Sequence, residues 1–562
     1  MKSDKLCFLK AVIFSAVVVL SGPQTACKRA GREDVGSDQA RLRDLDFSPF
    51  EDALAEIDPG RLAEITILIR DAELPEIQEK MAAGELNSVE LTLCLLDRIR
   101  RHDDYLRSYL ELNPHALDEA READRRREEG QISGSLLGIP VSVKDNIATV
   151  APMHTTVGAE ILLDHSPAAD AMVVRKLREA GAVILGKASL SELAGSLTTE
   201  PPGYNSISGM GVNPYGSGLP VSGSSSGSAI ATSALLTMVS VGTETSGSLI
   251  SPASSNGVVA MKPGFGLVSG EGVVPLIRFQ DSAGPVARSV KDAALLLTVI
   301  SEEGKDYAAG LEAGALNGVA VGVLRAGILA RDDSGATEFW LARIDEGLDL
   351  AGAVQFDLDE TFDEKPELLP VIFLGLSEDT VGYLVKAGAP VRTLSELQAY
   401  NLAEAGRRIP RGQNMIDLGV RVLSAIGEST GLREGEFAPL YEEATLSVRE
   451  GAAALLAGVF SENKVDVLIS LANTHSDLYA SGGYPAITVP LGLNGDGAPN
   501  GITLIGKPGE EAKLLAYAYA FEQATHCRAG PEIASEKKRK RKQAYAIFPS
   551  LLLPEGECLR RF

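Results

Sequence analysis

The fold of this chain is decided by the stretch VSGSSSGSAIATSALLTMVSVGTETSGSLISPASSNGVVAMKP, residues 221–263. Two loops rich in serine and glycine, Ser222–Ser228 and Gly242–Ser248, flank an apolar run that is long enough for a helix and the start of a strand. Glycine allows left-handed backbone and close approach of a ligand, and successive N–H groups in such a loop form an anion-binding nest. An oxyanion hole needs this geometry. Serine and glycine more often indicate a flexible linker, but the apolar run and the strand-like VVAMKP disfavour a linker here.

A serine nucleophile needs a base that removes its proton. Residues 223–227 form the pattern G-x-S-x-G, which makes Ser225 a candidate nucleophile with His475 or His526 as its base. This pattern requires a strand directly before it, whereas residues 213–220, NPYGSGLP, have the composition of a turn. The α/β-hydrolase hypothesis is therefore the weakest one.

Lys144 is the other candidate base, and it ends the apolar run in GIPVSVKDNI, residues 138–147. A lysine at a buried strand end loses solvation, which lowers its pKa toward the neutral form that a base requires. A single lysine in such a position is more often a surface residue at a strand terminus. The assignment therefore depends on the neighbouring motifs.

Several motifs occur in the order and spacing of the amidase signature family, which this chain resembles from about residue 72 to residue 525. They are GIPVSVKDN, GAVILGKASLSELA, SGSSSGSA, GTETSGSLISP, GPVARSVKDAALLL and GYPAITVPLG. Short apolar strands that alternate with helices predict an α/β fold. The resemblance implies an α/β/α sandwich with a mixed central β-sheet covered by helices.

The resemblance also implies a Ser–cisSer–Lys triad. Ser248 resembles the nucleophile, Ser224 the bridging serine that follows a cis peptide bond, and Lys144 the base. The separation of Ser224 and Ser248 agrees with the spacing in that family. Gly223 and Ser225 flank the bridging serine and are expected to support the site.

The backbone N–H groups of Thr245, Ser246 and Gly247 are the expected donors of the oxyanion hole. The loop departs from the pattern GTDTGGSIR that is usual in the family, because Glu244 replaces Asp, Ser246 replaces Gly and Ile250 replaces Arg. Glu244 is expected to support the site; the resemblance implies that peptide amidases share it and the missing arginine, so neither departure implies inactivity. Ser246 is less easily accommodated, since a Cβ restricts a turn of this kind.

Within the family the chain is most similar to bacterial peptide amidases, which remove the C-terminal amide of peptides. NSISG at 205–209 and NPY at 213–215 support this likeness. The expected substrate is a small-molecule or peptide amide, which is hydrolysed through an acyl-enzyme with release of ammonia. Two alternatives stay open: the glutaminase subunit of a tRNA amidotransferase, and a catalytically degenerate relative that binds peptides without turnover.

A formal net charge of −23 disfavours a nucleic-acid partner, because a phosphate backbone repels an acidic surface. Metal-ligand motifs such as C-x-x-C or H-E-x-x-H are missing from the sequence, so neither a metal nor another cofactor is expected. Lys187, in GKASLSELA, is expected to be a structural lysine near the site and not a second base.

Residues 1–26 have the layout of a secretory signal peptide, with lysines before a short apolar run and small residues at its end. The run is too short for a stable membrane span, so the protein is expected to be exported, to the periplasm or beyond. Cys27 directly after this signal is a candidate site for a lipid anchor. The oligomeric state stays open.

The rest of the chain is expected to consist of a linker at 27–57, an amidase domain at 58–530 and a basic tail at 531–562. Within the domain, residues 302–463 are mostly helical in pattern, and we expect them to form a lid or wall that selects the substrate. Strands are expected at 139–143, 182–185, 258–261, 319–324, 467–469 and 486–489.

Overall fold

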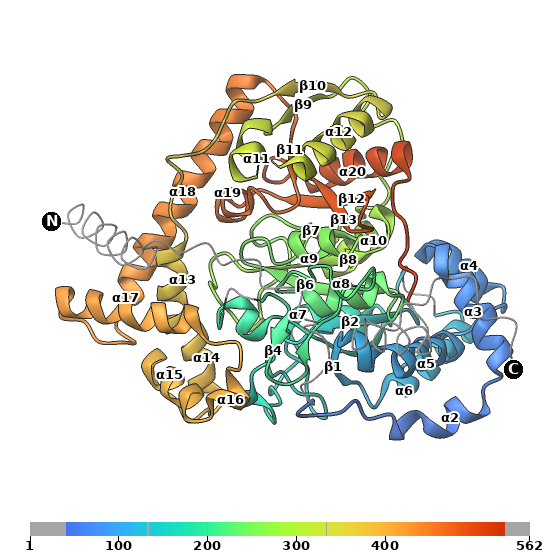
Figure 1. Cartoon of the computed structure of the whole chain (residues 1–562). Coiled ribbons are helices and arrows are strands. Elements are labelled where there is room, and N and C mark those ends of the chain that lie inside the picture. The colour runs from blue at the N-terminus through green and yellow to red at the C-terminus, as the bar shows by residue number, and fades with distance from the viewer. Residues whose placement is uncertain (1–40, 132–133, 199–200, 333, 534–562) are drawn as a thin grey trace, which may run out of the picture.

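The structure is a computed structural model, which describes residues 41–131, 134–198, 201–332 and 334–533 (Figure 1). The predicted signal peptide, Cys27 and the basic run of the predicted tail lie outside the described residues. Within these ranges, no helix combines the length and the apolar character that crossing a membrane requires. The described His, Cys, Asp and Glu side chains form no group of three or more that could hold a metal ion.

The strands are β1 (Tyr109–Leu112), β2 (Pro140–Lys144), β3 (Val183–Ala188), β4 (Tyr204–Asn205), β5 (Gly209–Met210), β6 (Val239–Glu244), β7 (Val259–Lys262), β8 (Ser282–Ala287), β9 (Ala320–Val323), β10 (Val354–Asp357), β11 (Val467–Leu471), β12 (Ala486–Leu493) and β13 (Pro499–Ile505). Eleven of them form one sheet in the order β1-β3-β2-β6-β8-β7-β12-β13-β11-β9-β10, and β4 pairs with β5 separately. Pairing is parallel among β3, β2 and β6 and among β11, β9 and β10, and it is antiparallel elsewhere. The sheet is therefore mixed.

Helices cover both faces of this sheet (Figure 1). On β7, Val259 and Met261 belong to the large apolar cluster that contains α10 (Val290–Ile300) and α20 (Glu511–Thr525). Ala260 between them packs with residues of α8 (Ser226–Ser233) and α9 (Ile250–Ser255). Successive side chains of a strand point to opposite faces, so the two helix pairs lie on opposite sides of the sheet.

The α/β class with a mixed sheet between helical layers is confirmed. All six predicted strands overlap observed ones, namely β2, β3, β7, β9, β11 and β12. Among the strands not predicted, β8 contains Gly284 and Pro285, which resemble turn residues, and β10 is short and mostly exposed. Both join the sheet through pairing with strands that are distant in sequence.

The other helices are η1 (Ser48–Phe50), α2 (Glu51–Glu56), α3 (Pro59–Asp71), α4 (Leu74–Ala82), α5 (Ser88–Leu106), α6 (Ala116–Glu128), η2 (Glu160–Leu162), α7 (Met172–Glu179), η3 (Glu192–Gly195), α11 (Arg325–Arg331), α12 (Gly335–Leu350), α13 (Leu369–Gly375), η4 (Leu376–Thr380), α14 (Val381–Lys386), α15 (Leu394–Ala403), α16 (Ala405–Arg408), α17 (Asn414–Thr430), α18 (Ala438–Asn463) and α19 (Ser476–Gly482).

The described part of the predicted linker, residues 41–57, packs on the domain. The Arg41 guanidinium donates to the carbonyl oxygen of Tyr109 at 2.7 Å and to the carboxylate of Asp103 at 2.9 Å. Phe50, next to α2, is fully buried. The folded domain therefore begins before the predicted boundary at residue 58. The mixed charge of this segment is typical of a linker. The sequence does not reveal that the segment packs on the domain, because Asp103, the buried partner of Arg41, lies far along the chain.

The predicted substrate-selecting region, residues 302–463, divides into two parts. Its first part contributes β9 and β10 to the central sheet, because β9 pairs with β11, so the boundary predicted at 302 is too early. From α13 onward the chain forms a helical region, in which Phe373, Phe437 and Tyr441 are buried in an apolar cluster shared with loops of the sheet, such as those of Leu193 and Ile277. This helical region lies beside the sheet and carries α13 to α18 (Figure 1).

Candidate active site

Three segments bring the predicted triad residues to one edge of the sheet. β2 and β6 are parallel neighbours, with Val143 opposite Val241, so their carboxyl ends lie side by side. Lys144 ends β2, and the loop with Ser248 follows β6 and leads into α9. The loop with Ser224 precedes α8, whose helix packs on both strands.

Lys144 is fully buried. Its Nζ lies 2.8 Å from Ser224 Oγ, 2.8 Å from Thr243 Oγ1 and 3.2 Å from the carbonyl oxygen of Thr243. Burial lowers the pKa of Lys144 to about 7, although the nearby carboxylates of Asp281 and Glu244 oppose this shift. A large fraction of this amine is therefore neutral near neutral pH.

Ser224 follows a cis peptide bond from Gly223, which is the geometry that the family resemblance implies. Its carbonyl oxygen accepts a hydrogen bond from Ser191 N at 3.0 Å, and its side chain is almost fully buried. A Cβ on Gly223 would lie 2.2 Å from Ser191 Oγ, so the close contact of the two loops requires glycine at this position.

Ser248 is half-buried, and its carbonyl oxygen accepts a hydrogen bond from Ser225 N at 3.1 Å. The two serine-rich loops are thus joined through their backbones. In the part of the chain that the structure describes, the Ser248 hydroxyl has no hydrogen-bond partner. The structure links Lys144 to Ser224 directly and leaves the Ser248 hydroxyl available.

The predicted oxyanion loop turns at Gly247, which has a φ of +83°. Ser246 does not have a positive φ, so its Cβ imposes no left-handed strain, and its hydroxyl donates to Ser476 Oγ at 3.3 Å. The amide N–H groups of the three predicted donors, Thr245, Ser246 and Gly247, bond to no protein group among the described residues, and neither does that of Ser248, which was not predicted. Consecutive free amides beside a left-handed residue can bind an anionic oxygen.

Glu244 fixes the far end of this loop. Its carboxylate accepts hydrogen bonds from Leu249 N at 2.8 Å and Ile250 N at 3.1 Å, at the start of α9. The charge of Glu244 acts on the buried Lys262 as well as on Lys144, and burial lowers the pKa of Lys262 to about 8. Glutamate therefore supports the loop in this chain although the arginine usual at position 250 is missing.

Ser225 does not have the surroundings of a nucleophile, which the α/β-hydrolase hypothesis requires. It is fully buried, and its hydroxyl donates to the Thr243 carbonyl oxygen at 3.0 Å and accepts from Thr243 N at 3.2 Å. His475 Nδ1 contacts Ser470 Oγ at 2.7 Å, and His526 ends α20. Neither imidazole is hydrogen-bonded to Ser225, so this pairing is wrong.

Lys187 is held away from the triad. Its Nζ donates to the Ile147 carbonyl oxygen at 2.6 Å and to Thr155 Oγ1 at 2.8 Å, and it lies 3.6 Å from the Asp145 carboxylate. These contacts fit the structural role predicted for it.

Sequence reasoning missed three polar residues that complete the site. Thr243 contacts Lys144 with two oxygens, and Asn146 Nδ2 donates to Thr243 Oγ1 at 3.0 Å. Gln280 Nε2 donates to the carbonyl oxygen of Thr245 at 2.7 Å. Thr243 and Asn146 lie inside the quoted motifs, where a polar side chain at a strand end is a usable signal. Gln280 becomes recognisable only once β8 is paired with β6.

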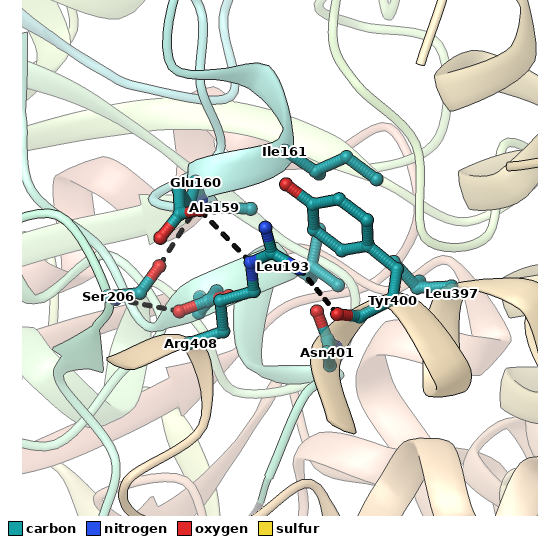
Figure 2. Close-up of a pocket in the computed structure, with 10 residues that line it drawn as sticks. Ala159, Glu160, Ile161, Leu193, Ser206, Leu397, Tyr400, Asn401 and Arg408 are labelled. Carbon is teal, nitrogen blue, oxygen red and sulfur yellow. Dashed lines mark hydrogen bonds and ion pairs between the residues drawn. The ribbon is translucent and has the colours of Figure 1, made fainter. Parts of the chain in front are cut away.

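A pocket lies where the helical region meets the loop after β3 (Figure 2), and none of the predicted triad residues lines it. Leu193 and Glu192 line it from the loop, and Tyr400 and Arg408 from α15 and α16. Arg408 Nε donates to Glu160 at 3.0 Å and its guanidinium stacks on the Tyr400 ring at 3.6 Å. Arg408 thus fastens the helical region to η2, which contains Glu160.

The sequence and the fold of this chain are similar to those of known proteins. The sequence pattern of the family named Amidase matches residues 90–515. A probable amidase of Arabidopsis thaliana is 36% identical over 83% of this chain and 92% of its own length. The A subunit of the glutamyl-tRNA(Gln) amidotransferase of Carboxydothermus hydrogenoformans is 32% identical over 80% of this chain and 96% of its own length. The crystal structure of the peptide amidase from Stenotrophomonas maltophilia superposes with a TM-score of 0.75 at 34% identity, and covers 83% of this chain and 99% of that one.

The matched range contains all six motifs that carry the resemblance. The mixed sheet, the serine-rich loops and the buried lysine occur together within it. The chain therefore belongs to the amidase family and is an amide hydrolase.

Proposed function

We propose that this protein hydrolyses primary carboxamides, with C-terminally amidated peptides as the substrate class, and releases ammonia through a Lys144–Ser224–Ser248 triad. The observation that carries the proposal is the contact of the Lys144 amine with Ser224 Oγ at 2.8 Å in a fully buried position. The likeness to the peptide amidase from Stenotrophomonas maltophilia supports the substrate class.

The partners of Lys144 suit a base. A neutral amine has two N–H bonds and one lone pair. The two oxygens of Thr243 can accept both N–H bonds, which leaves the lone pair for the Ser224 hydroxyl. This arrangement supports transfer of the Ser224 proton to Lys144, while Ser224 takes the proton of Ser248.

The Ser248 oxygen then attacks the carbonyl carbon of the amide, and the carbonyl oxygen becomes negatively charged. In this proposal the unpaired amides of the loop from Thr245 to Ser248 stabilise this oxygen. The relay returns a proton to the nitrogen, the C–N bond breaks and ammonia leaves. Water, deprotonated by the same relay, cleaves the acyl-enzyme ester and regenerates the Ser248 hydroxyl.

The glutaminase of a tRNA amidotransferase is the second candidate, because the A subunit of such an enzyme is 32% identical over most of this chain. This alternative requires partner subunits and activity that depends on tRNA. Export from the cytoplasm, which the N-terminal residues suggest, is part of our proposal and disfavours it. A copurification test with a tRNA-dependent glutaminase assay separates the two functions.

The test is ammonia release from a panel of amidated peptides, free amino-acid amides and simple amides. We expect release by the wild-type protein from amidated peptides and loss of at least about 99% of it in Lys144→Ala and in Ser248→Ala. Ser217→Ala, an exposed serine in the loop before Ser224, is the matched control and keeps wild-type activity. Full activity of Ser248→Ala contradicts the triad, and a folded wild-type protein without any release favours a peptide-binding relative.

A further inference from the structure

Several residues other than glycine adopt left-handed backbone conformation near the Lys144–Ser224 pair. Ten non-glycine residues among those described have positive φ, namely Arg107, Val157, Leu193, Ala194, Ser222, Leu235, Phe362, Lys464, Ala472 and His526. Left-handed backbone is unfavourable for residues with a Cβ, most of all for a β-branched one such as Val157. Four of the ten, Val157, Leu193, Ala194 and Ser222, connect to the site.

Val157 is tied to the residue after Lys144. Its N–H donates to the Asp145 carbonyl oxygen at 3.3 Å, and its φ is +55°. The Asp145 carboxylate accepts from Thr156 N at 3.0 Å and Gly158 N at 3.4 Å, on either side of Val157. This left-handed residue therefore holds the chain directly behind the proposed base.

Leu193 and Ala194 continue the connection to Ser224. Leu193 N donates to the Val157 carbonyl oxygen at 2.9 Å, and φ is +50° at Leu193 and +56° at Ala194. The next residue, Gly195, faces Ser224, since a Cβ built on it would lie 3.7 Å from Ser224 Cβ. Two left-handed residues in sequence thus place the loop against the bridging serine.

Ser222 approaches Ser224 from the other side. It precedes Ser224 by two positions and has a φ of +62°. Its hydroxyl lies 2.6 Å from Ser251 Oγ in α9, the helix that follows the Ser248 loop. Ser222 therefore connects the loop of Ser224 to the helix that follows the Ser248 loop.

Three of the other left-handed residues have a local explanation. Arg107, Lys464 and His526 are the C-caps of α5, α18 and α20, and a helix end commonly requires left-handed backbone. None of the four residues at the site ends an α-helix. Strained backbone at a functional site persists where the surrounding contacts enforce it.

We propose that Val157, Leu193, Ala194 and Ser222 are positioning residues that hold Ser224 against Lys144 by keeping the backbone in a narrow left-handed conformation. This inference rests on the proposed function of that pair. A Cβ confines positive φ to a small region, whereas glycine moves freely over a broad one. Glycine at these positions relieves the strain, and it also allows the Ser224 side chain to move away from Lys144.

The test compares Ala194→Gly with Lys464→Gly. Both residues are left-handed, with φ and ψ of +56° and +29° at Ala194 and +54° and +40° at Lys464, and each substitution removes strain of the same kind. Lys464 is exposed at the end of α18. We expect both variants to melt about 1–2 °C higher than the wild type. Only Ala194→Gly is expected to lower kcat, by about tenfold at unchanged KM, since small misplacements of catalytic groups are costly.

A second readout is the pH profile of kcat. Looser packing admits water to Lys144, so the rising limb of the profile moves to higher pH in Ala194→Gly and stays in place in Lys464→Gly. Hydrogen exchange of peptides that cover residues 221–228 reports the same release without turnover, and we expect faster exchange only in Ala194→Gly. Ser222→Gly is expected to repeat this pattern from the other side of Ser224.

The inference is overturned if Ala194→Gly keeps wild-type kcat and wild-type exchange at 221–228. It is also overturned if kcat falls only together with a lower melting temperature, because that result indicates a purely structural role. Wild-type protein and Lys144→Ala are assayed in parallel. Equal activity of these two contradicts the proposed function, whereas the exchange data then still decide whether the left-handed residues hold Ser224.

Discussion

Lys144 on β2 and Lys187 on β3 lie on neighbouring parallel strands, and both are fully buried. Lys187 lies 3.6 Å from the Asp145 carboxylate, whereas Lys144 contacts only the neutral oxygens of Ser224 and Thr243. Burial lowers the pKa of both amines, and for Lys187 the adjacent carboxylate is the strongest opposing influence. The partners of a buried lysine, more than burial itself, therefore distinguish a base from a structural cation.

The largest effect is expected from Lys144→Met. This substitution removes the proposed base, so we expect kcat to fall about 10³–10⁴-fold, near the upper range for general-base catalysis. The melting temperature should stay equal or rise, because no carboxylate loses a direct partner. Ammonia release and thermal unfolding monitored by circular dichroism measure the two quantities. A variant that keeps a tenth of wild-type activity contradicts the role of Lys144.

Lys187→Met is expected to have its main effect on stability, whereas Lys144→Met has its main effect on kcat. The Asp145 carboxylate is left buried without its cation, which costs about 3–5 kcal/mol in the free energy of unfolding. Urea denaturation measures the loss. The control is the double variant Lys187→Met with Asp145→Asn, in which the charge is removed as well, and we expect it to recover more than half of the stability. Equal stability of both variants argues against a functional ion pair between Lys187 and Asp145.

The smallest effect is the pH dependence that follows from the Lys144 pKa of about 7. Only the neutral amine accepts a proton, so kcat/KM is expected to rise about tenfold from pH 6 to pH 8. Asp281 and Glu244 are the carboxyl groups whose charges act on Lys144, and burial raises the pKa of Asp281 to about 6. A profile that falls across this range contradicts a neutral-lysine base.

Stability provides a separate test of the same pKa. The folded-state pKa of Lys144 lies below the ordinary value of 10.5, so the unfolded chain binds more protons between about pH 7 and 10.5. The free energy of unfolding of the wild type should therefore rise with pH across this window. Lys144→Met lacks this contribution, and the difference between the two proteins in urea denaturation at several pH values isolates it.

The sequence predicts the elements that are buried and local, and it fails where a residue's environment comes from distant segments. β3 and β7 are predicted because their apolar residues are consecutive, as expected for strands covered on both faces. Within residues 302–463, which are mostly helical in pattern, the chain breaks between α14 and α15, where Gly388 has a φ of +80°. A left-handed glycine ends a helix although the surrounding pattern continues.

For the site, the motifs and the family resemblance predict which residues meet. They do not predict how these residues are held. Thr243 contacts Lys144 only because β6 lies next to β2, and Gln280 reaches Thr245 only because β8 pairs with β6. The left-handed Leu193 likewise donates to the carbonyl oxygen of Val157, in a segment far away along the chain. Such contacts follow from strand order, which periodicity and propensity leave undetermined.

The apolar cluster of the helical region has a consequence for how such an enzyme changes over generations. Leu193, beside the bridging serine, and Ile277, near Gln280, belong to the same cluster as Phe373 and Tyr441 of the helical region. A mutation that reshapes this wall for a new substrate also shifts the supports of the reacting groups. Substrate range and turnover are therefore expected to drift together, and selection for a new amide should require compensating changes in the loops behind the triad.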